Sequence, residues 1–150
     1  MDKITILTKK TDELSSDELL QIMQERVKVF VVEQNCPYQE IDDKDFQAHH
    51  MMLFLKDQLA AYCRIIPHDD VQYMSIGRVL VVKEFRGYHF ASQMLKKAIL
   101  ETLKIGNNKD IKIAAQSYLQ SFYHSLGFKP VSDVYLEDNI PHLDMIYSPS

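Results

Sequence analysis

The segment that decides the fold is Val79–Ser92, which reads VLVVKEFRGYHFAS. Its four leading apolar residues are typical of a buried strand, and the periodic apolar residues from Phe90 onward predict a helix. The first amides of a helix have no partner within the helix and carry partial positive charge. A strand that leads through a tight turn into a helix therefore predicts a binding site for phosphate or pyrophosphate.

The charge around this turn supports the anion site. Six basic and two acidic residues lie between Arg78 and Lys104, although the whole chain has a net charge of −4. The alternative is a surface turn followed by a solvated basic helix, and the segment alone does not decide between the two.

The rest of the chain predicts a mixed α/β sheet in a single domain spanning residues 1–150. We expect strands at 3–8, 50–56, 59–66, 73–82 and 111–115, two or three more within 128–147, and helices over 17–32, 89–105 and 117–127. The predicted order is β-α-β-β-β-α-β-α-β-β. Ser15 and Glu18 form a capping-box pattern before the first helix. Residues 27–32 also fit a strand, but helix is favoured because they continue the same apolar stripe.

The chain contains only four glycines, so the position of each is informative. Gly106 and Gly127 follow predicted helices, where left-handed caps are expected. Gly77 lies inside a predicted strand, where glycine often marks a bulge or a close approach of another backbone. Gly87 lies in the turn that leads into the helix at Phe90.

Composition excludes several classes of protein. The 150 residues hold no apolar run long enough to cross a bilayer and no secretory signal pattern, so we expect a cytoplasmic protein without a membrane partner. Cys36 and Cys63 fit two reduced thiols, and no residue set has the spacing of a metal site. The acidic total argues against a nucleic-acid partner.

Two motifs carry a resemblance to a known family. Residues 86–91, RGYHFA, resemble the pyrophosphate loop of the GNAT N-acetyltransferases, and residues 116–128, QSYLQSFYHSLGF, resemble that family's segment ending in Y-x-x-x-G-F. Residues 29–38, VFVVEQNCPY, and 137–142, EDNIPH, are similar to the ElaA-like branch. The resemblance implies a GNAT-like fold and direct transfer of an acetyl group from acetyl-CoA to a primary amine of a small molecule or peptide.

The pyrophosphate loop departs from the family pattern at one position. His89 stands where the family usually has the central glycine, which lets the backbone approach the phosphates closely. Either the amide of His89 still binds phosphate, with the imidazole folded outward or near a phosphate, or the affinity for acetyl-CoA is reduced.

The resemblance also implies which residues contact acetyl-CoA. They are Val79, Leu80, Val81, Arg86, Gly87, Tyr88, His89, Phe90, Ala91, Ser92, Gln116 and Tyr123. A backbone amide near Leu80 or Val81 would hold the acetyl carbonyl. Tyr123 would be the general acid that protonates the departing thiolate, with Tyr118 as a nearby competitor and a purely structural aromatic role as the alternative.

The acceptor side of the site is less defined. Glu33 is the first candidate for the general base, and His50 and His142 are alternatives because imidazole titrates near neutrality. Glu33, Asp42, His50 and His142 are also the candidates for binding the amine. Residues 33–45 hold five acids and one lysine, so they either attract a cationic acceptor or form a solvated loop.

Other functions stay open at this point. An acyl-CoA-binding module with little turnover is the main alternative, because His89 departs from the family pattern. A DNA-binding regulator would use the basic stretch 78–104, but the acidic total counts against it. A homodimer is plausible because strand edges near the C-terminus would need cover.

Overall fold

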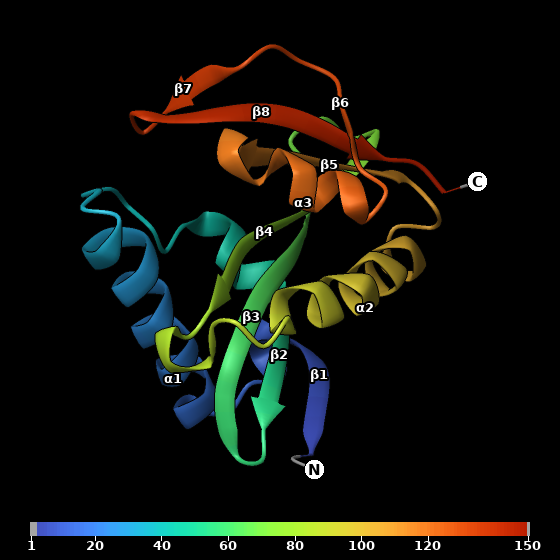
Figure 1. The fold of residues 1–150 in the computed structure, drawn as a ribbon. Coiled ribbons are helices and arrows are strands. Elements are labelled where there is room, and N and C mark those ends of the chain that lie inside the picture. The colour runs from blue at the N-terminus through green and yellow to red at the C-terminus, as the bar shows by residue number, and fades with distance from the viewer. Residues whose placement is uncertain (1–2, 150) are drawn as a thin grey trace.

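The strands of the protein form one mixed sheet in the computed structural model, which describes residues 3–149. The strands are β1 (Ile4–Lys10), β2 (His49–Leu55), β3 (Gln58–Pro67), β4 (Tyr73–Val81), β5 (Asp110–Gln116), β6 (Lys129–Pro130), β7 (Tyr135–Glu137) and β8 (Ile140–Tyr147). Their order is β1-β2-β3-β4-β5-β8-β6, with β7 paired to β8 (Figure 1). The predicted mixed α/β class is confirmed.

Three α-helices accompany the sheet: α1 (Ser16–Arg26), α2 (Phe90–Ile105) and α3 (Gln120–Ser125). The predicted capping box is present, since Ser15 accepts a bond from the Glu18 amide. Residues Val27–Glu33 continue α1 as the π-helical segment η2, so the helical interpretation of this stretch is confirmed over a strand. Short 3-10 turns are η1 (Thr11–Glu13), η3 (Asp43–Gln47), η4 (Lys83–Phe85) and η5 (Ser117–Leu119). No helix within residues 3–149 is long and apolar enough to cross a membrane.

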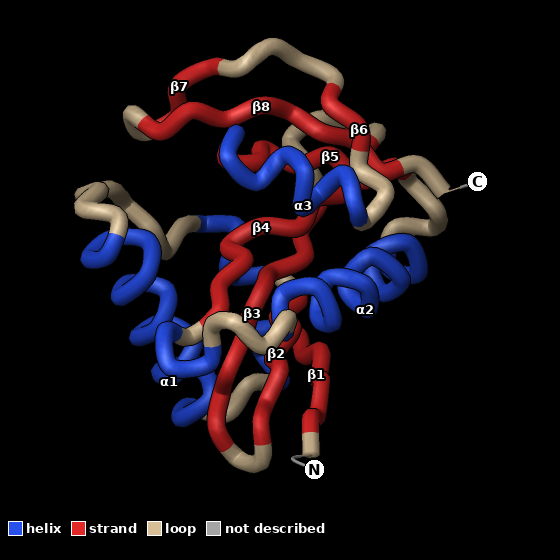
Figure 2. Tube along the Cα trace, viewed as in Figure 1, coloured by secondary structure: helices blue, strands red, loops and turns tan. Residues whose placement is uncertain are grey.

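The alternation of side chains along β2 and β3 separates two hydrophobic cores. Met51 and Leu53 are buried in the core that contains residues of α2 and α3. Met52 and Tyr62 instead pack with Ile22 of α1 in a second, smaller core. Because successive side chains of a strand point to opposite faces, helices α1 and α2 lie on opposite sides of the sheet (Figure 2).

The centre of the sheet opens where β4 and β5 meet. These strands run parallel, and within the described residues they pair only at Tyr73 with Asp110 and Met74 with Ile111. Beyond that point they diverge, as Figure 1 shows. The remainder of β4 therefore has one edge without a strand partner, and its backbone groups are available to a ligand.

Local backbone geometry bears on three predicted glycine positions. Gly77 does lie at a bulge, because the β3–β4 register shifts there and Arg78 takes a positive φ of 52°. Gly127 has the expected positive φ of 103°. The prediction for Gly106 is wrong: its φ is −94°, and Asn107 takes the left-handed conformation after the helix instead.

Candidate active site between the diverging strands

A cleft of about 830 Å³ occupies the opening between β4 and β5. Its walls come from Gly77–Val81 of β4, Ile113–Gln116 of β5, the end of η2, the α3 region and the hairpin of β7 and β8. Segments that are far apart in sequence thus meet around one space. The divergence of two neighbouring strands is the structural reason that this space exists.

The turn before α2 has the geometry that anion binding requires. The first bond of the helix runs from the Gln93 amide to the His89 carbonyl at 3.2 Å, so the preceding amides have no helical partner. Gly87 takes a positive φ of 92°, and a Cβ there would meet nothing within 4 Å. The exposed loop can therefore accept a pyrophosphate against its backbone.

The backbone of His89 lies in the left-handed region, which glycine adopts without strain. Its φ of 62° and ψ of 26° are left-handed. Histidine visits this region more readily than most side chains do, at a cost of about 1–2 kcal/mol. A histidine is therefore compatible with this backbone conformation, and the residue is exposed.

Arg86 links this loop to the opposite wall of the cleft. Its Nη2 donates to Glu33 Oε1 at 2.9 Å, and its Nε donates to the Val81 carbonyl at 3.0 Å. The pair brings the first candidate base into contact with the candidate phosphate-binding residue. One oxygen of Glu33 is therefore engaged by a guanidinium.

Tyr123 lines the cleft from α3 and is only 8% exposed. Its ring packs edge-on against Phe122 and Phe128, with centroids at 5.2 and 5.8 Å. Burial raises the pKa of the phenol well above its ordinary value. The group stays protonated at neutral pH, which is the state that a proton donor needs. Tyr118 also lines the cleft but is 76% exposed.

His142 faces the same cleft from β8, where it is the register partner of Gln116 on β5. Its Nδ1 donates to the Ile140 carbonyl at 2.6 Å. Its Nε2 lies 3.7 Å from Glu137 Oε2. The strand pairing, which the sequence does not specify, brings these groups to the cleft.

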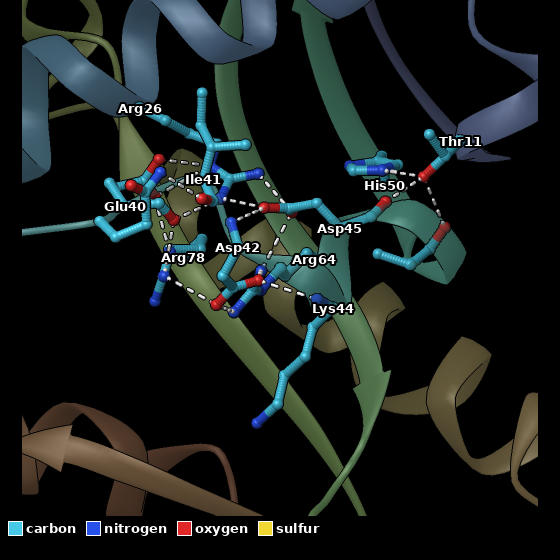
Figure 3. Close-up of polar contacts among 12 residues, drawn as sticks. Thr11, Arg26, Glu40, Ile41, Asp42, Lys44, Asp45, His50, Arg64 and Arg78 are labelled. Atoms are coloured by element: carbon cyan, nitrogen blue, oxygen red, sulfur yellow. Dashed lines mark hydrogen bonds and ion pairs between the residues drawn. The ribbon is translucent and has the colours of Figure 1, made fainter.

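A buried ionic cluster holds the acidic segment against the sheet (Figure 3). Arg26, which is 0% exposed, donates through Nε to Glu40 and through Nη1 to Asp45 Oδ1 at 2.7 Å. Burial opposes ionisation of Asp45, but the bonds from Arg26 and from the Asp42 amide hold its pKa well below the ordinary value. Buried charges of this kind persist because they are paired.

Two cleft-lining arginines complete the cluster. Arg64 donates to Asp42 at 2.7 Å and to Asp45 at 3.0 Å, and Arg78 contacts Glu40 and Asp42. Three carboxylates therefore face three guanidinium groups. The expectation of free acids in residues 33–45 is therefore wrong for Glu40, Asp42 and Asp45, which are paired, whereas Glu33 and Asp43 are exposed.

Two candidate acceptor residues lie away from the cleft wall. His50 is 0% exposed, with Nδ1 2.6 Å from the Tyr62 hydroxyl and Nε2 2.8 Å from Thr11 Oγ1. Burial lowers its pKa to about 4. Asp42 is outside the cleft lining and is bound by the arginines of the cluster. The structure thus does not bring either residue to the cleft.

Comparison with known proteins fits this geometry. A family model described as an acetyltransferase (GNAT) domain matches residues 13–149. The chain belongs to the GNAT acyltransferase family. It is 43% identical to protein ElaA of Escherichia coli K12 over 136 residues, which cover 89% of each chain.

Solved GNAT structures agree with the fold. The crystal structure of Escherichia coli ElaA matches with a TM-score of 0.90 at 39% identity, covering 97% of this chain and 100% of that one. An acyl-CoA N-acyltransferase from Pseudomonas aeruginosa matches with the same TM-score and coverage at 36% identity. The expected GNAT-like fold and ElaA-like branch are confirmed.

The GNAT cleft collects most of the predicted site residues. Those that line it are Glu33, Val79, Leu80, Val81, Arg86, Ala91, Gln116, Tyr123 and His142. Gly87, Tyr88, His89, Phe90 and Ser92 form the turn and the start of α2 beside it. The sequence interpretation missed Glu137, Arg64 and Arg78 as cleft residues. Glu137 lay in the quoted motif 137–142, which was the available signal.

Proposed function

We propose that this GNAT chain transfers an acetyl group from acetyl-CoA to a primary amine of a small molecule or peptide. The observation that carries the proposal is that the open turn before α2 and the buried phenol of Tyr123 border one cleft. The turn supplies amides for the pyrophosphate, and the diverging strands supply room for the thioester arm. Gln116 lies on the cleft wall of β5, where it would contact that arm.

The reaction follows from the groups in the cleft. The free amine attacks the acetyl carbonyl, and a backbone amide near Leu80 or Val81 on the open edge of β4 stabilises the oxyanion. A C–N bond forms, the C–S bond breaks, and Tyr123 protonates the thiolate. Glu33 and His142 are the two candidate bases that line the cleft.

Titration calorimetry with acetyl-CoA tests the binding step, with dephospho-CoA and ATP as controls. We expect saturable binding of acetyl-CoA and weaker binding of both controls. Release of free CoA thiol is then followed over a panel of primary amines and lysine-containing peptides. Absence of binding would overturn the proposal, whereas binding without transfer to any amine would favour an acyl-CoA-binding module.

A further inference from the structure

We infer that Glu137 and His142 of the C-terminal hairpin receive the acceptor ammonium: the Glu137 carboxylate holds its charge, and His142 Nε2 removes its proton. This inference rests on the proposed N-acetyltransferase function. It names the proton acceptor and the charge that the acceptor substrate must carry.

The hydrogen bond at Nδ1 prepares His142 for this role. A carbonyl oxygen only accepts, so the 2.6 Å contact with Ile140 requires the proton to be on Nδ1. In the neutral ring, Nε2 is then the unprotonated nitrogen, with a lone pair available. The ring is also stacked on Tyr135, with centroids at 6.3 Å. The tautomer and the ring position are therefore fixed before any substrate binds.

The separation of Nε2 and Glu137 Oε2 leaves a place for a cation. At 3.7 Å the two atoms are too far apart for a good direct hydrogen bond. An ammonium nitrogen at about 2.8 Å from each atom can donate to both at once. The Glu137 side chain is 52% exposed, so a ligand can reach it from the cleft mouth.

The hairpin around this pair selects a positive acceptor. Residues 135–147 contain no lysine or arginine. The tip turns at Asp138 and Asn139, with φ values of 52° and 61°, which is typical of a tight two-residue hairpin turn. Asp138 also lines the cleft, and its carbonyl lies 3.8 Å from Cys36 Sγ on the opposite wall. The charged side chains that this hairpin brings to the cleft, apart from His142, are therefore carboxylates.

Glu33 is less suited to the same task. Its carboxylate is held by Arg86 at 2.9 Å, so taking a proton would weaken that ion pair. Arg86 is also the candidate contact for the pyrophosphate. His142 has no such conflict, because its Nδ1 partner is an uncharged carbonyl.

These roles account for both protons that leave the ammonium nitrogen. His142 Nε2 takes one proton from the ammonium and passes it to solvent. The neutral amine attacks, the C–N bond forms, and collapse of the intermediate breaks the C–S bond. The Tyr123 hydroxyl proton goes to sulfur, and the second proton leaving the nitrogen restores the phenol.

The first test needs no identified acceptor. Long-range ¹H–¹⁵N spectra of the ¹⁵N-labelled protein, assigned with His142→Asn, report the ring tautomer, and butylammonium chloride serves as the probe. We expect the Nδ1-protonated tautomer, and a saturable shift at Nε2 that is much smaller in Glu137→Gln. The opposite tautomer, or no shift at millimolar probe, would overturn the inference.

The second test uses an amine that the panel in the previous section identifies. His142→Asn keeps a donor for the Ile140 carbonyl but has no base, and we expect kcat to fall by about 10²–10⁴-fold with an unchanged affinity for acetyl-CoA. Added imidazole should partly restore His142→Ala. Glu137→Gln should raise KM for the amine about tenfold, a loss of about 1.4 kcal/mol, without changing KM for acetyl-CoA.

Two control variants show whether the changes in kcat and KM arise from the cleft residues or from a general loss of folded protein. His124→Asn removes an exposed imidazole and Asp133→Asn removes an exposed carboxylate, and both residues lie outside the cleft lining. Both variants should leave kcat and the KM for the amine unchanged. Unchanged kcat in a folded His142→Asn would overturn the inference while the proposed function stands. No transfer by the wild type to any amine would instead reject the proposed function, and the spectra alone would then decide whether the pair binds an ammonium.

Discussion

At the scale of single residues, Tyr123 carries the most specific chemical prediction. Its phenol is buried in the cleft wall and burial raises its pKa, so it is protonated at neutral pH, as the proposed role of proton donor to the thiolate requires. We expect Tyr123→Phe to lower kcat by about 10²-fold or more, because only the proton donor is lost. Calorimetry should show an unchanged affinity for acetyl-CoA. A larger loss in Tyr118→Phe than in Tyr123→Phe would reassign the role to Tyr118.

Variants of His89 test whether a histidine is compatible with the loop position at which the family usually has a glycine. The residue already has the left-handed backbone that the loop needs. We therefore expect His89→Gly to bind acetyl-CoA at least as tightly as the wild type. His89→Val should weaken binding and lower the free energy of unfolding by more than about 1 kcal/mol, because β-branched residues avoid this conformation. Calorimetry and urea unfolding measure both quantities. Equal behaviour of the two variants would show that the loop conformation does not depend on residue 89.

At the scale of elements, the ionic cluster joins α1 and the 40–45 segment to β3 and β4. Asp45 accepts bonds from Arg26 and Arg64 in a buried setting. Removing one partner of such a pair leaves an uncompensated buried charge, which typically costs about 3–5 kcal/mol. We expect Asp45→Asn to lower the free energy of unfolding by that amount in urea titrations.

The exposed pair Lys44–Asp69 provides the control for this change. Asp69 has an 82% exposed side chain, so Asp69→Asn should leave stability nearly unchanged. If the two asparagine variants lose similar stability, the cluster is not the element that holds the acidic segment in place.

Elements with a local signal could be predicted from the sequence, whereas pairings across the chain could not. The Ser15 box, the apolar stripe of the first helix and the bulge at Gly77 depend on neighbours a few residues away. The pairing of Arg26 with Asp45, or of Gln116 with His142, depends on how distant segments meet. A local pattern reports charge but not its partner, so the sequence does not predict that Glu40, Asp42 and Asp45 are paired with arginines.

The same reason limited what could be predicted of the site. The family motifs identified the loop at 86–91 and Tyr123, because each motif is contiguous in the chain. The cleft itself exists because β4 and β5 separate after two paired positions. That divergence has no signature in either strand, so the contribution of Arg64 and Arg78 to the cleft wall became visible only in three dimensions.

At the scale of the whole molecule, stability should depend on pH through the buried groups beside the sheet. His50 has a pKa of about 4 in the folded protein, against about 6.5 in an unfolded chain. Between these values the unfolded state binds a proton that the folded state does not, so the free energy of unfolding falls as pH falls from about 6.5 to 4, by up to about 3 kcal/mol. Below pH 4 a further fall should follow, because the pKa of Asp45 is depressed and its protonation breaks the cluster.

Urea unfolding across this pH range separates the two contributions. His50→Gln removes the titrating ring, so its stability curve should flatten between pH 6.5 and 4 while the fall below pH 4 remains. Asp45→Asn should keep the fall in stability between pH 6.5 and 4 and should flatten the curve below pH 4. Only the slopes are compared, because each substitution also removes a hydrogen bond and shifts its whole curve downward. Parallel curves for the wild type and His50→Gln between pH 6.5 and 4 would show that the buried imidazole does not stay neutral in the folded protein.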